Sequence, residues 1–199
     1  MLKNLLAAVA ATRRRALNLP FLVALFLFAI FSKANAQTVS ASATILETAT
    51  SASFNTFVLT LENTSPSSSI ETFWFAWVPG KDFLDSDPLS VQTPSGWTFA
   101  ITHGGTHDGY AIQFSTSTDP LSTGSDLTGF GFTTADSLTE IEGDSNFYST
   151  TPVTTSEVST GPTDSGIASS PFIVAVVPEP IFAPFIVGAA LLLVWRRRL

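Results

Sequence analysis

The 199-residue chain contains no cysteine. This absence excludes disulfide bonds, zinc–thiolate sites, thiol nucleophiles and an N-terminal lipidated cysteine. A domain without such crosslinks has to be stabilised by its hydrophobic core alone. Charged residues are also scarce, at 13% of the chain, and they are distributed very unevenly.

Basic residues are almost missing from the middle of the chain. Eight of the nine lysines and arginines lie within residues 3–33 or 196–198, and the ninth is Lys81. All sixteen acidic residues lie between Glu47 and Glu179, which gives this middle part a formal charge of −15. A surface this acidic repels nucleic acid and anionic lipid. We therefore expect no nucleic-acid partner.

The first 36 residues have the three parts of a secretory signal peptide. Arginines at 13–15 form a charged segment, and residues 19–31 form an apolar run. Ala34 and Ala36 then supply the small-residue pattern of a cleavage site, which predicts cleavage before Gln37. The secretion machinery is thus an expected partner, and an uncleaved signal anchor is the alternative.

The end of the chain, residues 177–199, also has three parts in a fixed order. Val177 is followed by Pro178, Glu179 and Pro180, and the two prolines fix φ and favour an extended, exposed backbone. An uncharged apolar run then covers residues 181–195, which predicts a transmembrane helix. The arginines that follow mark the cytoplasmic end of such a helix; they are Arg196, Arg197 and Arg198.

This order of elements resembles the PEP-CTERM sorting signal of exported bacterial proteins. The matching residues are Pro178 to Pro180, the helix that contains Gly188, and the closing arginines. The resemblance implies that an exosortase-type enzyme, a membrane protease-transpeptidase, recognises the Pro-Glu-Pro sequence. It also implies that the helix is a transient anchor and that the arginines are a topological stop. Ile181 departs from the family pattern, which often has a small polar residue there; an ordinary C-terminal membrane anchor is the alternative.

Alternating apolar and polar residues predict β-strands between the two terminal segments. Residues 55–63 place every second apolar side chain on one face, and residues 70–78 carry aromatics on both faces, which indicates a central strand. Residues 97–101 and 110–114 predict a hairpin across a glycine-rich loop. Further strands are expected at 38–49, 127–133, 153–158 and 172–177, with a weaker signal at 146–148, while residues 81–94 are expected to be a long connection.

Short strands with turn signals between them predict an all-β fold, a single β-sandwich of the immunoglobulin-like or jelly-roll type. No helical period is evident outside the two terminal segments. The expected organisation is a signal peptide at 1–36, a β-sandwich domain at 37–176 and the sorting signal at 177–199.

Few residues in the predicted sandwich indicate chemistry. His103 and His107 are four residues apart, but they lie in a glycine-rich loop without a third ligand of the usual kind, so we interpret them as part of a solvated loop. Two groups of acidic residues lack the spacing of a twelve-residue calcium loop, and we interpret them as surface acids. These groups are Asp82, Asp85 and Asp87, and Glu140, Glu142 and Asp144 with Asn146. We expect no metal and no cofactor.

Catalytic motifs are missing as well. The chain has no G-x-S-x-G sequence and no phosphate-binding loop, and sixteen acids make chance carboxylate pairs inevitable. We therefore expect that the protein is not an enzyme.

Aromatic residues offer one candidate ligand surface. Trp74, Trp77, Trp97 and Tyr110 could form a platform for sugar rings, although aromatics in strands usually belong to a core. An exposed row of these tryptophans would favour carbohydrate binding, whereas their burial would favour a structural role.

Together these features predict an exported protein of the cell surface or extracellular matrix, with a structural or interaction role. The protein would be anchored in the membrane by its C-terminal helix until an exosortase-type enzyme processes it. The alternative is a carbohydrate-binding module of the cell envelope or exopolysaccharide.

Overall fold

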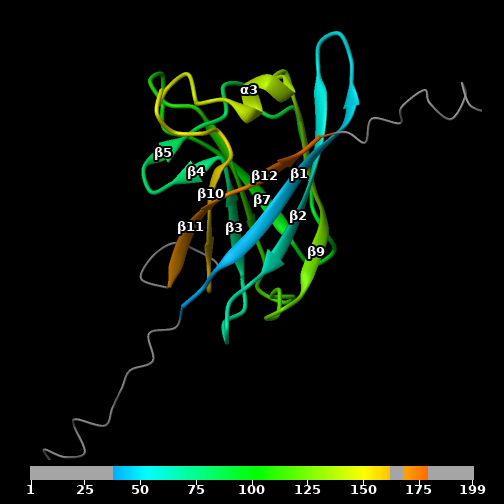
Figure 1. Ribbon diagram of the computed structural model, residues 1–199, viewed down its shortest axis with the longest axis vertical. Coiled ribbons are helices and arrows are strands. Elements are labelled where there is room, and N and C mark those ends of the chain that lie inside the picture. The colour runs from blue at the N-terminus through cyan, green and yellow to red at the C-terminus, as the bar shows by residue number, and fades with distance from the viewer. Residues whose placement is uncertain (1–37, 162–167, 179–199) are drawn as a thin grey trace, which may run out of the picture. The chain divides into compact units, whose positions relative to one another are not determined.

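The computed structural model describes residues 38–161 and 168–178 (Figure 1). The predicted signal peptide and cleavage site lie outside the described residues, and so do Glu179, Pro180, the apolar run 181–195 and the final arginines. Within the part of the chain that is described, no helix has the length and hydropathy needed to span a membrane.

Twelve strands and one short helix make up the described residues. They are β1 (Ala41–Thr50), β2 (Asn55–Asn63), β3 (Thr72–Phe75), β4 (Trp77–Val78), β5 (Lys81–Asp82), β6 (Ser90–Gln92), β7 (Thr98–His103), β8 (Tyr110–Ser115), β9 (Asp126–Thr134), α3 (Leu138–Glu142), β10 (Thr155–Ser159), β11 (Ser169–Ile173) and β12 (Ala175–Val177).

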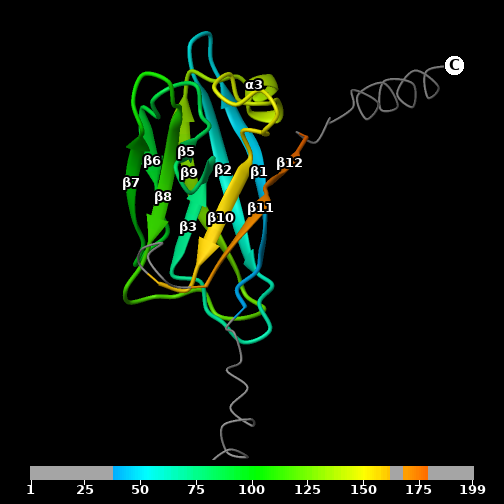
Figure 2. The same cartoon turned by 90° about the vertical axis from the view of Figure 1, so that its left-hand side faces the viewer.

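The strands form two five-stranded sheets that pack face to face (Figure 2). The first sheet has the strand order β12-β1-β2-β9-β6, and the second has the order β11-β10-β3-β8-β7. The short strands β4 and β5 form a separate hairpin. The predicted all-β sandwich is confirmed at this level, and its immunoglobulin-like or jelly-roll class stays a prediction.

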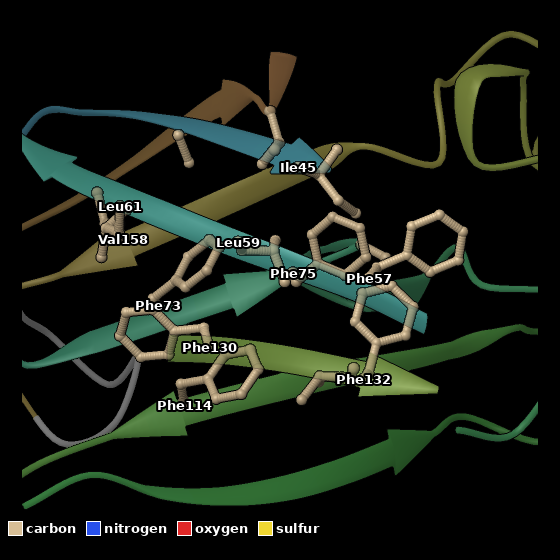
Figure 3. Close-up of a cluster of buried hydrophobic side chains, with 14 of the residues drawn as sticks. Ile45, Phe57, Leu59, Leu61, Phe73, Phe75, Phe114, Phe130, Phe132 and Val158 are labelled. Atoms are coloured by element: carbon tan, nitrogen blue, oxygen red, sulfur yellow. The ribbon is translucent and has the colours of Figure 1, made fainter. Parts of the chain in front are cut away.

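The core between the sheets is built largely from phenylalanine (Figure 3). Phe130 of β9 lies 5.0 Å from Phe114 and 5.7 Å from Phe73 of the opposite sheet, measured between ring centroids. Phe57 and Phe132 pair within the first sheet at 5.2 Å. All five rings are at most 1% exposed. Burial of each such side chain stabilises the fold by about 1.5–3 kcal/mol, which is the main stabilising term in a chain without disulfides.

The strands with the clearest alternation lie where the sequence predicts them. β2 covers residues 55–63, and β9 extends the predicted strand 127–133 by one residue at each end. The predicted hairpin is formed by β7 and β8, with Phe99 opposite Phe114 and Ile101 opposite Ile112.

Two predicted strands are each divided in two. The expected strand 70–78 is interrupted at Ala76, whose φ of 58° lies in the left-handed region that L-residues other than glycine rarely adopt. The expected strand 172–177 is divided at Val174, because the chain there leaves the second sheet and joins the first. β11 pairs antiparallel with β10, whereas β12 pairs parallel with β1.

Three further expectations were wrong. Residues 146–148 form turns rather than a strand, and the connection 81–94 contains β5 and β6. The helix α3 was not expected. It begins with a capping box in which the Ser137 side chain accepts from the Glu140 backbone N–H, while the Glu140 carboxylate accepts from the Ser137 backbone N–H.

The position of Phe130 in the core predicts how far its removal destabilises the domain. Phe130→Ala is expected to lower the free energy of unfolding by about 3–5 kcal/mol, because the cavity would open between both sheets. Phe54→Ala serves as the control, since Phe54 is 43% exposed, and its cost is expected to stay below about 1 kcal/mol. Urea unfolding of the two variants measures the difference, and equal costs would contradict this description of the core.

Candidate ligand-binding site

Two loops meet at one end of the second sheet. Leu84, which follows β5, and Tyr110, the first residue of β8, exchange two backbone hydrogen bonds of 2.9 and 2.8 Å. The Gly109 N–H also donates to the Asp82 carbonyl at 3.0 Å. These bonds hold the β4–β5 hairpin against the loop between β7 and β8.

Glycine is needed at Gly109 because the backbones approach closely. A Cβ atom there would lie 2.5 Å from the Leu84 carbonyl oxygen and 2.7 Å from that of Asp82. A Cβ at Gly104 would collide with the Asp108 carboxylate. The glycines of this loop therefore allow close packing as well as a tight turn.

A cavity of about 300 Å³ lies between the two loops. Its lining combines an indole, carboxylates, a hydroxyl, an imidazole and an ammonium group, from Trp77, Gly80, Lys81, Asp82, Thr102, His103, Gly104 and Asp108. A slightly larger cavity of about 370 Å³ lies between Gly96 and Thr118, but hydroxyl groups are the main polar groups of its lining. The first cavity is therefore the better candidate for a specific site.

Asp108 organises the polar side of the candidate cavity. Its Oδ1 atom accepts hydrogen bonds from the Asp82 N–H at 2.9 Å, the Gly109 N–H at 3.1 Å and the Tyr148 hydroxyl at 3.0 Å. Burial raises the pKa of Tyr148, and the hydrogen bond to Asp108 raises it further. Lys81 lies over the Tyr148 ring, with its Nζ 5.0 Å from the centroid. Asp108 thus links both loops to the segment after α3.

Asp82 is the most buried acid of the cavity, at 4% exposed. Its Oδ1 accepts from the Thr102 hydroxyl at 3.2 Å. Burial raises the pKa of the Asp82 carboxyl, and the negative charge of Asp108 raises it further. The two carboxylates therefore make a site that favours bound hydroxyl or other hydrogen-bond donors.

His103 is held in one orientation. Its Nδ1 donates to the Gly109 carbonyl at 2.7 Å, and its ring stacks on Tyr110 with centroids 4.3 Å apart. His107, four residues later, is exposed, as is His103. The hydrogen bond to Gly109 and the stacking on Tyr110 are what fix the His103 ring.

The four predicted aromatics do not form an exposed platform. Trp74 and Trp77 stack on each other at 4.2 Å on the outer face of the second sheet, but they are only 7% and 6% exposed. Trp97 belongs to the core, where it packs edge-on against Phe130 at 5.1 Å. Tyr110 is half-buried and lies under His103.

The strand register and the bend at Ala76 explain why Trp74 and Trp77 lie on the outer face, apart from the core residue Trp97. Trp74 lies opposite Gln113, while Phe73 lies opposite the core residue Phe114, so Trp74 points away from the core. Strand alternation alone would place Trp77 on the other face from Trp74. The left-handed residue Ala76 reverses this and lets the two indoles stack.

The predicted acidic groups are also separated. Asp82 lines the cavity, whereas Asp85 accepts hydrogen bonds from the Asn146 backbone and side chain. Asp87 is exposed. In the described ranges, no group of three or more histidines and acids is placed to hold a metal ion.

Asp136 is a buried acid that sequence reasoning did not single out. It is 3% exposed, and its Oδ2 accepts from the Ser86 N–H at 3.3 Å. Burial raises the pKa of Asp136, and it also raises that of Asp85. The Ser137 hydrogen bonds lower the pKa of Glu140, whose carboxylate caps α3. An isolated aspartate in a polar segment gives no sequence signal for such burial.

The start of the predicted sorting motif lies at the surface. Val177 is the last residue of β12 and is 40% exposed, and Pro178 is exposed as well. The rest of the motif lies outside the described residues.

No protein family model matches the sequence, and no curated protein matches it. Solved structures show only distant similarity. An exo-β-N-acetylglucosaminidase of family GH20 from Vibrio harveyi has 12% identity over 69% of this chain with a TM-score of 0.40, and the match spans 18% of that enzyme.

Two smaller modules match this chain with similar identity and TM-score. A cohesin module of a family 33 glycoside hydrolase from Clostridium perfringens has 14% identity, covers 71% of this chain and 100% of its own, and has a TM-score of 0.39. The carbohydrate-binding module CBM3b of cellobiohydrolase 9A from Clostridium thermocellum has 10% identity over 68% and 86%, with a TM-score of 0.34. Similarity at this level assigns neither a family nor a function.

The raised pKa of the buried Asp82 carboxyl predicts how the stability of the domain depends on pH. In the unfolded chain its pKa has the ordinary value of 3.8, whereas the folded pKa is raised. The group's stabilising contribution is therefore fully present below pH 3.8 and is lost as the pH rises through the folded pKa. We expect Asp82→Asn to raise the thermal midpoint at pH 7, because it removes a buried charge. The midpoint of this variant should also increase less than that of the wild type when the pH is lowered.

Calorimetric scans between pH 4 and 8 measure this effect. Asp87→Asn, at an exposed position of the adjacent loop, is the matched control and should keep the wild-type pH profile. An Asp82→Asn profile parallel to that of the wild type would show that the burial of this carboxylate does not affect stability.

Proposed function

We propose that this protein is a non-catalytic interaction protein of the bacterial cell surface or extracellular matrix. It is exported by the secretion machinery and sorted by an exosortase-type enzyme that recognises Pro178, Glu179 and Pro180. The observation that carries the proposal is the position of this motif. Pro178 directly follows β12, the last strand of the described residues, so the motif begins where the described strands end.

The chain near the motif is suited to recognition by an enzyme. β12 is a three-residue edge strand that pairs only with β1 within the first sheet, and two of its residues are exposed. The predicted membrane helix begins at residue 181, four residues after Val177, which is a span of about 13 Å when the chain is extended. We therefore expect the enzyme to reach the proposed processing site at the domain surface, close to the membrane.

The body of the domain is consistent with this role. Its formal charge of −14 favours solubility outside the cell, and its stability requires no disulfide formation. The three tryptophans among the described residues are 5–7% exposed, so they offer little ring face for stacking on a sugar. This burial supports an interaction or structural role over carbohydrate binding.

Carbohydrate binding remains the second candidate because of the cavity described above. Trp77 forms one wall, while Asp82, Thr102 and His103 offer acceptors and donors that suit sugar hydroxyl groups. This cavity favours a polysaccharide of the extracellular matrix as the ligand of the second candidate.

Glu179→Ala tests the sorting proposal. The substitution should leave the thermal midpoint within about 1 °C of the wild type, because the residue follows the last strand. It should trap the full-length protein in the membrane fraction. Immunoblots of membrane, envelope and medium measure the distribution, and Glu142→Ala is the matched control. A wild-type distribution of Glu179→Ala would contradict the proposal.

A sugar-binding assay separates the two candidate functions. The first proposal predicts no saturable binding of the host's exopolysaccharide in isothermal titration calorimetry. Under the second, binding should weaken at least about tenfold in His103→Ala, which removes a cavity group, but not in His107→Ala. Saturable binding with this difference would replace the first proposal by the second.

A further inference from the structure

The two sheets present four edge strands among the described residues, and three of them are protected against pairing with another chain. β6 and β12 are only three residues long, and β11 contains Pro171. Short edge strands and edge prolines are common means of preventing association between sheets. β7 has six residues and contains neither proline nor a lysine, arginine, aspartate or glutamate.

The edge strand β7 also exposes large apolar side chains. Figure 2 shows it as the outermost strand of its sheet, next to β8. Phe99 and Ile101 lie opposite the core residues Phe114 and Ile112, and so they point to the inner face. They are nevertheless 48% and 37% exposed. Apolar side chains and the backbone groups that β8 does not use therefore occur together along this edge.

The charge distribution indicates which partner can approach this edge. From Pro88 to Thr118, a range that includes β6, β7 and β8, Asp108 is the one residue with a formal charge. The predicted domain as a whole, residues 37–176, carries a formal charge of −14. Like-charged copies repel each other, but screening limits this repulsion to about 10 Å at physiological salt. A second copy can thus approach β7 without bringing its acidic groups close.

The sequence of β7 is complementary to itself. Residues 98–102 are Thr-Phe-Ala-Ile-Thr, which has the same polar and apolar order in both directions. When two such strands pair antiparallel around Ala100, each Phe99 lies opposite Ile101 of the other copy. On the opposite face of the paired strands, each Thr98 lies opposite Thr102 of the other copy. Aromatic–β-branched and Thr–Thr pairs are both favourable across antiparallel strands.

We propose that β7 pairs with β7 of a second copy around a twofold axis at Ala100. The pairing joins the two copies through one continuous sheet, as expected of a symmetric dimer with the same patch on both subunits. A single strand pair buries less than the roughly 1,200 Å² of a stable interface, so the dimer is weak in dilute solution. This inference does not rest on the proposed sorting function.

Crosslinking tests the register, because the chain has no cysteine of its own. In the full chain, Ala100→Cys would place two thiols directly opposite each other, with Cβ atoms about 5 Å apart. A short bismaleimide should therefore crosslink this variant to a dimer at least about tenfold faster than Thr139→Cys, an exposed position on α3. Thr98→Cys alone should react slowly, since its two copies would be about 13 Å apart. A mixture of Thr98→Cys and Thr102→Cys should react fast.

Charged substitutions at Ala100, the residue on the proposed twofold axis, provide a second test that does not depend on crosslinking. Ala100→Lys and Ala100→Glu should each weaken self-association of the full chain about fivefold, because like charges would face each other. Mixing the two variants should restore association, which sedimentation velocity measures. Ile173→Lys, on the opposite edge of the same sheet and 62% exposed in the wild type, should associate like the wild type. Equal crosslinking of Ala100→Cys and Thr139→Cys, or no recovery in the mixture, would overturn the proposal.

Discussion

The packing of phenylalanine rings between two sheets is the interaction on which the structure depends. Without cysteine, no disulfide holds the sheets together, and the described residues include no metal cluster that could do so. Phe130 contacts both Phe73 and Phe114 of the opposite sheet, and these contacts place β9 over β3 and β8. The open edges β6 and β7 consequently lie on the same side of the sandwich. Both the candidate cavity and the proposed dimer edge are positioned by this core.

A second constraint acts locally at Ala76. Its left-handed conformation ends β3, turns Trp77 onto Trp74, and leads the chain into the β4–β5 hairpin. That hairpin then brings Asp82 to Asp108. A conformation that is unfavourable for alanine therefore occurs next to a cavity in which carboxylates, an imidazole and an indole meet. Such a combination of backbone strain and a polar cavity is common at binding sites.

Local sequence pattern predicted the longer strands and one hairpin, but it did not predict the other strand pairings. Alternation in residues 55–63 and 97–114 identified β2 and the β7–β8 hairpin. The change of sheet at Val174 had no local signal, because residues 172–177 form a continuous apolar run in which no residue marks a break. Ala76 gave no signal either, since a positive φ is usually marked by glycine. The sequence drew attention to His103 and Asp82, but only the tertiary structure shows that they share a cavity.

We propose that the domain is exported and then released from its C-terminal signal. The mass of the mature protein, recovered from its native host, is the decisive measurement. Release should give a chain that begins at Gln37 and ends near Pro180. A mass that retains residues 181–199 would instead show a permanently anchored protein and would rule out release.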